Sequence, residues 1–142
     1  MRVLGIDLGD KRTGIAISDE LGIIASPLKT IKTSDVHVLI REIVAIINET
    51  GASKIVLGQP LNMNGSSGKS VDKAADFMKL LEEATGLEVI LQDERLSTVS
   101  AHKILNESNF GGSNKRKNII DTLASSIILQ TYLNKEATKN GR

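Results

Sequence analysis

The sequence predicts an α/β domain built on one mixed sheet of five strands, three antiparallel and then parallel ones, with helices on both faces. Short apolar runs bounded by turn residues alternate with stretches whose apolar residues recur at helical spacing. Their order, three strands and then strands alternating with helices, favours such a sheet. The chain has 142 residues, 40% of them hydrophobic, with 2 prolines, which suits a single core. We expect one domain over residues 1–135 and a polar tail over 136–142.

The first three strands are expected to form a meander. Residues 3–8 and 14–18 are apolar and flank residues 9–13, a turn-rich link that indicates a hairpin. Residues 23–31 predict a third antiparallel strand, in which Pro27 marks an edge or a bend.

The remaining elements are two further strands and the helices between and after them. Apolar residues from Val36 to Ile47 predict a helix with Ser34 as its cap and Gly51 after its end. Residues 54–58 and 87–91 read as strands, and residues 71–85 as a second helix that ends before Gly86. Beyond these, we expect a loop over 59–68, a short helix over 97–107, a basic loop over 110–117 and a last helix over 118–133.

Composition excludes several classes of protein. The absence of cysteine rules out disulfides, thiolate metal sites and cysteine nucleophiles, and it favours a reducing cytoplasm. The two histidines, His37 and His102, are too few for a zinc site. No apolar run reaches the length of a membrane span, and Asp7 interrupts the stretch that a secretory signal would need. We therefore expect a cytoplasmic protein without a membrane partner.

The charges and the aromatic residues bear on nucleic acid as a partner. Residues 111–142 carry a net charge of +4, although the whole chain carries only +1. With two Phe and one Tyr, a surface that stacks several bases is hard to build, so contacts to nucleic acid would rely on the phosphate backbone.

Three acidic positions stand out as candidates for chemistry. Asp7 lies in an apolar strand, where a carboxylate is costly unless it is paired or binds a cation. Asp93 and Glu94 close another strand, at the end where open α/β sheets bind ligands. Asp121 lies early in the last helix, among small and apolar residues. Each has an ordinary alternative: Asp7 as acceptor for the turn amides, Glu94 in a solvated turn, and Asp121 as a first-turn acid stabilised by the helix dipole.

Carboxylates from two strands and one helix that met in space would repel one another unless divalent cations neutralised them. Oxygen ligands without histidine or cysteine favour Mg²⁺ or Mn²⁺. Two such ions can activate a water molecule and stabilise the leaving oxygen of a phosphodiester. The first hairpin, Gly5 to Gly14, also suits a turn that cradles phosphate, which leaves a nucleotide-binding, ATPase-like module as an alternative.

Four motifs together resemble the YqgF family of Holliday junction resolvases and pre-16S rRNA nucleases. They are Gly5-Ile-Asp-Leu-Gly-Asp-Lys-Arg-Thr-Gly14, Gly58-Gln-Pro-Leu-Asn-Met-Asn-Gly65, Asp93-Glu-Arg-Leu-Ser-Thr98 and Ile120-Asp-Thr-Leu-Ala-Ser-Ser-Ile-Ile-Leu129. They occur in the family's order and cover nearly the whole chain. The resemblance implies an RNase H-like fold.

The resemblance also assigns roles to residues. Asp7, Glu94 and Asp121 match the family's three catalytic, metal-binding acids, so Glu94 rather than Asp93 is the acid of its motif. The basic residues that flank these acids become candidates for phosphate contacts: Lys11, Arg12, Arg95, Lys115, Arg116 and Lys117. Gln59 and the pair Ser125–Ser126 depart from the family's usual residues, which bears on the rim of the site and on helix packing, not on the acids.

We therefore expect a Mg²⁺- or Mn²⁺-dependent endonuclease acting on structured nucleic acid, with precursor 16S rRNA favoured as its substrate. A Holliday junction resolvase acting on branched DNA is the alternative among nucleases, and it would need a dimer. A binding module without catalysis is a further alternative. The sequence does not distinguish RNA from DNA, and it is compatible with a monomer or a weak homodimer.

Overall fold

The computed structural model describes residues 1–59, 69–93 and 113–139. These residues form the strands β1 (Val3–Asp7), β2 (Arg12–Ser18), β3 (Ala25–Lys32), β4 (Lys54–Gln59) and β5 (Val89–Asp93), and the helices α1 (Val36–Thr50), α2 (Lys69–Thr85) and α4 (Ser113–Lys139). None of the helices in these ranges has the length and apolar character required to cross a membrane.

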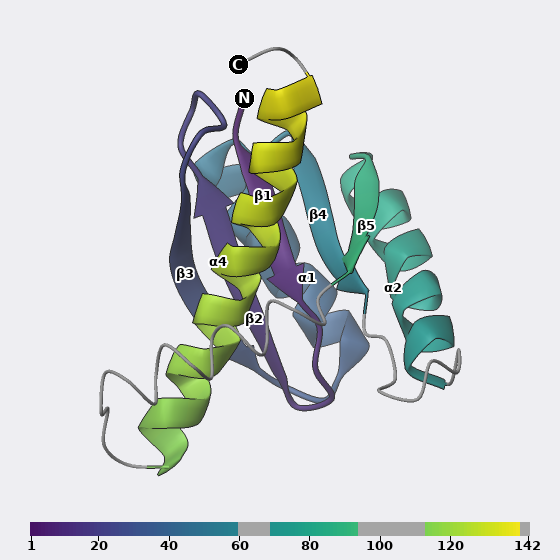
Figure 1. Cartoon of the computed structure of the whole chain (residues 1–142). Coiled ribbons are helices and arrows are strands. Elements are labelled where there is room, and N and C mark those ends of the chain that lie inside the picture. The colour runs from purple at the N-terminus through teal and green to yellow at the C-terminus, as the bar shows by residue number, and fades with distance from the viewer. Residues whose placement is uncertain (60–68, 94–112, 140–142) are drawn as a thin grey trace.

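The strands form one sheet in the order β3-β2-β1-β4-β5 (Figure 1). β1, β2 and β3 pair antiparallel, whereas β4 is parallel to both β1 and β5. The predicted mixed five-stranded sheet is therefore confirmed. β3 is one of the two edge strands of the described sheet. Its pairing with β2 shifts register beside Pro27, because Ala16 pairs with Pro27 while Ile15 pairs with Lys29.

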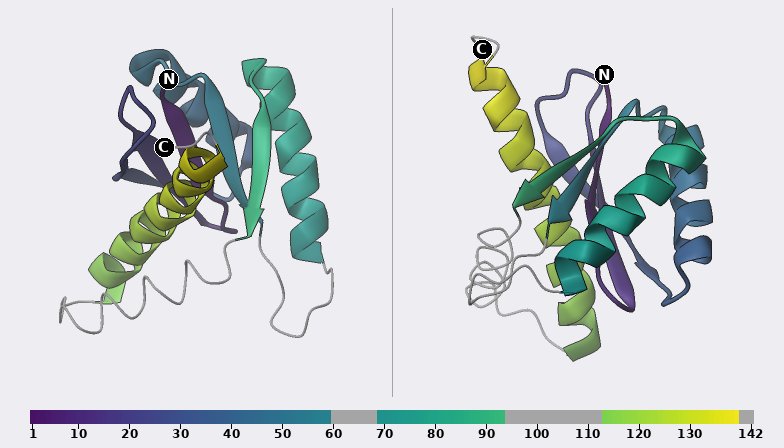
Figure 2. Two further views of the ribbon diagram at one scale, coloured as in Figure 1. Left: turned by 45° about the horizontal axis from the view of Figure 1, so that its top comes forward. Right: turned by 90° about the vertical axis from the view of Figure 1, so that its right-hand side faces the viewer.

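Helices cover both faces of the sheet. α1 and α2 lie on one face and α4 lies on the other (Figure 2). Along β1, Leu4 and Ile6 are buried in the core beneath α1 and α2, whereas Val3 is buried in the core beneath α4. Because successive side chains of a strand alternate between faces, a strand covered on both sides reads as one continuous apolar run.

Helix α1 has the predicted end but a different cap. The cap is Asp35 rather than Ser34: one carboxylate oxygen of Asp35 accepts hydrogen bonds from the backbone N–H groups of His37 and Val38, at 2.9 and 3.4 Å. At the other end Gly51 adopts φ +76°, a conformation that glycine enters without strain, and donates its N–H to Ile47 at 2.9 Å.

Helix α4 is longer than predicted at both ends. It begins at Ser113 rather than Asn118 and continues to Lys139 rather than Leu133. The expected basic loop over 110–117 is thus wrong for residues 113–117. Lysine and arginine are good helix formers, and no glycine or proline lies between Gly112 and Gly141. The predicted loop over 59–68 is wrong at Gln59, which ends β4, and its residues 60–68 lie outside the described residues. The predicted helix over 97–107 lies outside them as well.

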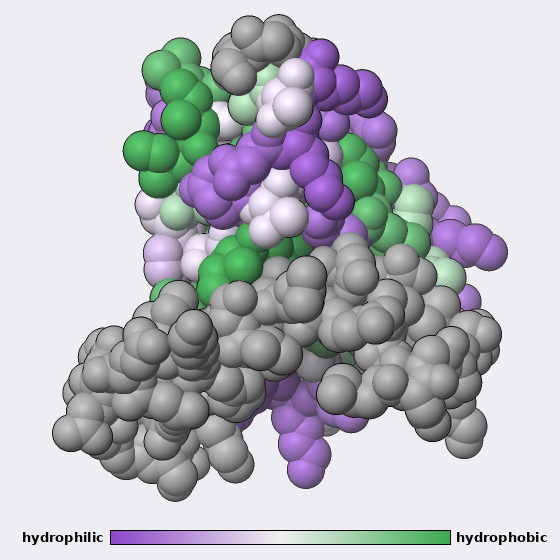
Figure 3. All heavy atoms as spheres, viewed as in Figure 1, coloured by the Kyte–Doolittle hydropathy of each residue, from purple (hydrophilic) through white to green (hydrophobic). Residues whose placement is uncertain are grey.

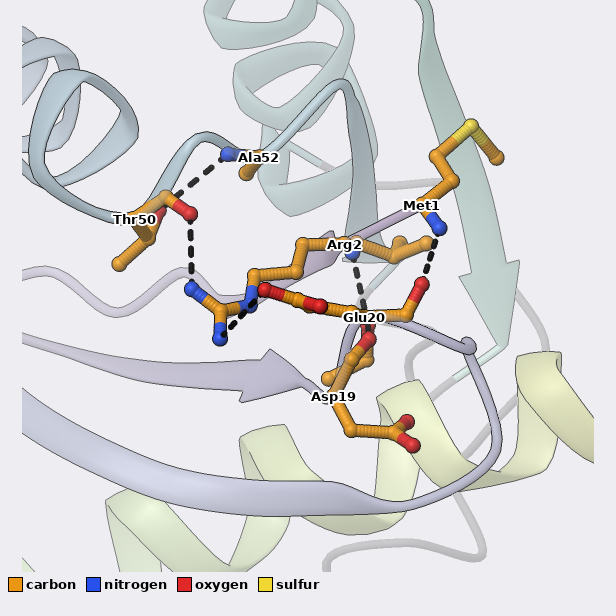
Figure 4. Close-up of polar contacts among 8 residues, drawn as sticks. Met1, Arg2, Asp19, Glu20, Thr50 and Ala52 are labelled. Atoms are coloured by element: carbon orange, nitrogen blue, oxygen red, sulfur yellow. Dashed lines mark hydrogen bonds and ion pairs between the residues drawn. The ribbon is translucent and has the colours of Figure 1, made fainter.

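Polar contacts fix the end of the sheet at which β1 begins. Arg2 donates a hydrogen bond to the Thr50 carbonyl at 3.0 Å and forms an ion pair with Glu20 at 3.8 Å, while the Met1 amino group donates to the Glu20 carbonyl (Figure 4). The Gln130 side chain accepts from Ala25 N and donates to Ile23 O, at 2.8 and 2.9 Å, and so ties the β2–β3 hairpin to α4.

The tip of the β2–β3 hairpin is apolar. Leu21, Ile23 and Ile24 are exposed there, in contrast to the hydrophilic outer face of α4 (Figure 3).

Candidate active site

The carboxyl ends of β1, β4 and β5 lie at one edge of the sheet, because these three strands run in the same direction. Ile6 pairs with Leu57, and Gly58 pairs with Gln92. Asp7, the last residue of β1, is therefore level with Gly58 and Gln92. This edge is the position at which α/β sheets bind ligands.

Asp7 is partly buried and pairs with Gly14 of β2. Alternation along β1 places it on the same face as Val3 and Gly5, which is the face that α4 covers. Glycine at the neighbouring positions 14 and 58 leaves that face of the sheet without side chains on either side of Asp7. The acid that the sequence singled out thus stands between two strand positions that carry no side chain.

Helix α4 approaches β1 at Gly5. A Cβ atom added at Gly5 would lie 2.8 Å from Leu129 Cβ and 3.1 Å from the Ser125 carbonyl oxygen, so only glycine fits at this contact. Val3 packs with Tyr132 and Leu133, farther along the helix, so α4 runs antiparallel to β1.

This contact also determines which part of α4 is level with Asp7. From Gly5 to Asp7 the strand advances about 6.6 Å, which corresponds to roughly four helical residues. Position 121 lies one turn before Ser125 and is therefore close to the level of Asp7.

The start of α4 removes one alternative for Asp121. Because the helix begins at Ser113, Asp121 lies eight residues inside it, and the first turn contains no acidic residue. The interpretation of Asp121 as a first-turn acid stabilised by the helix dipole is wrong, since that effect is confined to the end of a helix.

The third candidate acid follows β5. Asp93 is the last residue of that strand, and Glu94 and Arg95 come directly after it, outside the described residues. Gln92, which the sequence analysis did not single out, has a buried side chain on the face of Ile90, the face covered by α4. It is two strands away from Asp7, about 10 Å between Cα atoms, with Gly58 between them. The sequence did contain a signal for Gln92, because it is a polar residue near the end of an otherwise apolar strand.

The predicted basic residues differ in their surroundings. Lys11 is exposed in the β1–β2 turn. Arg12 is only partly exposed, and its buried Nη1 atom has no hydrogen-bond partner among the residues that the structure describes. By alternation with Gly14 and Ala16, Arg12 lies on the α4 face, as Asp7 does. The positions Lys115, Arg116 and Lys117 belong to the first turns of α4.

The glycine-rich first hairpin has structural reasons for two of its glycines. A Cβ atom at Gly9 would lie 2.2 Å from the Arg12 carbonyl oxygen, so closure of the β1–β2 turn itself requires glycine. Gly5 is required by the contact with α4. Packing and turn closure therefore account for two of the three glycines in the pattern that had suggested a phosphate-cradling turn.

Electrostatic perturbations resolved in the described residues lie away from this edge. A hydrogen bond from Lys54 Nζ to the Tyr132 hydroxyl, at 3.2 Å, raises the pKa of Lys54. Backbone N–H groups of Ile24 and Ile23 lower the pKa of Asp19. Among the described side chains, no three His, Cys, Asp or Glu residues are grouped as metal ligands; of the three predicted acids, Asp7 alone is among those side chains.

A sheet of order β3-β2-β1-β4-β5, with an acid at the end of its central strand and a helix packed tightly against that strand, defines an RNase H-like domain. The fold resembles two resolvases in particular. Thermus thermophilus RuvC in complex with a Holliday junction substrate gives a TM-score of 0.60 at 14% identity over 97% of each chain. The fowlpox virus Holliday junction resolvase gives 0.57 at 15% identity over 95% of this chain and 99% of its own.

The sequence profile of the family described as RuvX, Holliday junction resolvase, matches residues 1–135, and the chain belongs to that family. Relatives named "Putative pre-16S rRNA nuclease" cover nearly its whole length. The protein from Clostridium tetani is 47% identical over 94% of this chain and 96% of its own, and that from Thermoanaerobacter pseudethanolicus is 45% identical over 98% and 100%.

Proposed function

We propose that this protein is a divalent-metal-dependent endonuclease that cleaves phosphodiester bonds in structured RNA, with the precursor of 16S rRNA as its substrate. The observation that carries the proposal is the position of Asp7. This partly buried residue stands at the carboxyl edge of the sheet, between glycines and close to the level of position 121. β5, the strand that leads into Glu94, ends at the same edge, with β4 between it and β1. The names of the close relatives support the choice of substrate.

The residues at this edge suit Mg²⁺ or Mn²⁺. Asp7, Glu94 and Asp121 would supply only carboxylate oxygens, the ligands that these hard cations prefer. A bound ion would lower the pKa of a coordinated water molecule and neutralise charge at the leaving oxygen.

The chain's own part is to hold its groups in place. The pairing of β1 with β2 fixes Asp7, and the Gly5 contact sets the distance of α4 from β1. We propose that Arg12 contacts a backbone phosphate, because its buried Nη1 atom has no acceptor within the described part of the chain. Lys11, Arg95, Lys115, Arg116 and Lys117 are proposed as further phosphate contacts, which would make binding strongly salt-dependent.

The test makes the same substitution, glutamate to glutamine, at a residue on each side of β5 and compares the two variants. Glu94→Gln removes the proposed ligand, whereas Glu88→Gln makes the same change at an exposed position just before the strand begins. Purified wild-type protein, both variants and Asp7→Asn are incubated with a precursor 16S rRNA fragment, in magnesium and in EDTA.

We expect wild type and Glu88→Gln to cleave equally in magnesium, and Glu94→Gln and Asp7→Asn to lose at least 100-fold in rate while keeping the wild-type melting temperature. Cleavage by Glu94→Gln at the wild-type rate would refute the proposal.

Resolution of Holliday junctions is the second candidate, because the family is described by that activity. The acids would serve both reactions, so the substrate discriminates between them. A four-way DNA junction in the same experiment, with the protein's mass measured by sedimentation, tests this candidate: symmetric cleavage by a dimer, with the precursor RNA left intact, would favour it.

A further inference from the structure

A cavity of about 390 Å³ opens on the face of the sheet opposite α4. Its lining residues come from the β1–β2 turn, the start of α1 and the middle of α2. Figure 2 shows that α1 and α2 cover this side of the sheet. Its apolar walls include the buried side chains of Leu39 and Phe77 and the partly buried side chains of Leu8 and Leu80. A volume of this size is typical of a site for a small ligand or for one or two side chains of a partner.

The rim of the cavity is acidic. Asp10, Asp35 and Asp76 are exposed around its mouth, each from a different one of the three segments that form it. No lysine, arginine or histidine lines the cavity among the described residues. Asp76 forms no hydrogen bond or ion pair within that part of the chain.

The chemistry of the cavity narrows the class of ligand. The described acids are not grouped as a metal site. The three carboxylates repel phosphate, so nucleic acid does not suit this mouth. An apolar floor buries an alkyl or aryl group, while the carboxylates at the mouth favour a positive charge at its end.

We propose that this cavity binds an organic cation with an apolar body: an ammonium or guanidinium group carried on an aryl or alkyl group. Such a group comes either from a free amine or from a basic, apolar segment of a partner protein. The proposal does not depend on the nuclease activity, because Asp7 and α4 lie on the other face of the sheet.

The test uses three probes of similar shape and different charge: 2-phenylethylamine, 2-phenylethanol and 3-phenylpropionate. Binding to the full chain is followed by the backbone amide resonances of Gly9, Leu39 and Leu80. We expect the amine to bind about tenfold more tightly than the alcohol, and the carboxylate not to bind. A fourth probe, the peptide acetyl-Gly-Phe-Arg-Gly-amide, distinguishes the sources: tighter binding than the amine indicates a protein segment, and weaker binding indicates a free amine.

Substitutions then locate the charge effect. Asp76→Asn is expected to weaken binding of the amine two- to fivefold, the effect of losing one exposed ion pair, and to leave binding of the alcohol unchanged. The matched control is Glu83→Gln, because Glu83 is an exposed acid of the same helix that does not line the cavity. This control should leave the affinities for the amine and for the alcohol unchanged. Equal binding of amine and carboxylate, or no shift of these resonances with the amine or the peptide, would overturn the proposal.

Discussion

Substituting Gly5 by alanine tests how closely α4 must approach β1 for the proposed site to work. The added Cβ atom would lie 2.8 Å from Leu129 Cβ and 3.1 Å from the Ser125 carbonyl oxygen. Carbon atoms pack at about 3.5 to 4.0 Å, so the helix must move away by roughly 1 Å. Neither obstacle is the flexible end of a side chain, so a change of rotamer does not relieve the contact.

The expected cost follows from that displacement. Forcing a methyl group into a packed core destabilises a protein by about 1 to 3 kcal/mol. Active-site groups must be held within about 0.5 Å, and an error of about 1 Å can cost about 100-fold in rate. We therefore expect Gly5→Ala to lower both the free energy of unfolding and the magnesium-dependent cleavage rate, because the helix carries Asp121.

The measurement pairs urea denaturation with the RNA cleavage assay, and Gly51→Ala is the control. Gly51 has φ +76° and no atom within 4 Å of an added Cβ, so alanine there costs about 1 kcal/mol of backbone strain without moving α4 relative to β1. Gly51→Ala should lose stability but keep its cleavage rate. Wild-type stability and activity for Gly5→Ala would show that the helix contact has no role in the site.

Four further substitutions test the described contacts. The buried hydroxyl of Thr13 has no hydrogen-bond partner in residues 1–59, 69–93 and 113–139, so Thr13→Val should raise the free energy of unfolding by about 1 kcal/mol. Ser18→Ala should lower it by a similar amount, because the Ser18 hydroxyl accepts a hydrogen bond from Val3 N at 2.8 Å. Urea denaturation that ranked the two variants in the opposite order would contradict this. Asp35→Ala removes the cap of α1 and should cost about 1 kcal/mol in the same assay, and an unchanged midpoint would mean that the cap adds nothing. Backbone hydrogen bonds hold the pKa of Asp19 in the folded state below the usual 3.8, so its carboxylate stabilises the fold above that pH and loses this effect as pH falls through the lowered pKa. The stability advantage of wild type over Asp19→Asn should therefore shrink between pH 6 and pH 2. A constant difference in the free energy of unfolding over that range would refute the reasoning.

Several features of the fold were predictable because they depend on local sequence. Alternation and helical spacing predicted the order of strands and helices, since each element must bury its apolar residues on the face that its own period defines. Gly51 ended α1 as predicted, because few residues other than glycine enter a left-handed conformation without strain. Asp7 stood out because a carboxylate in a buried strand needs a stated role.

Other features depend on residues that are distant in the sequence. Gly5 looks like part of a phosphate-binding turn until Leu129 and Ser125 are seen against it. Ser34 and Asp35 are adjacent, and helical spacing places the start of a helix only to within one or two residues. The sequence pattern therefore did not decide which of the two caps α1. The cavity between Leu8, Leu39 and Phe77 joins three segments that no local pattern connects.

The sequence by itself singled out Asp7, because a carboxylate in an apolar strand is conspicuous, and it predicted Glu94 and Asp121 as partners from their motifs. Only the tertiary structure decided that β1, β4 and β5 end at one edge of the sheet and that α4 packs on the face to which Asp7 belongs. The physical reason is that strand register and helix approach are set by packing between distant segments, and here by a glycine that lets a helix lie against the central strand.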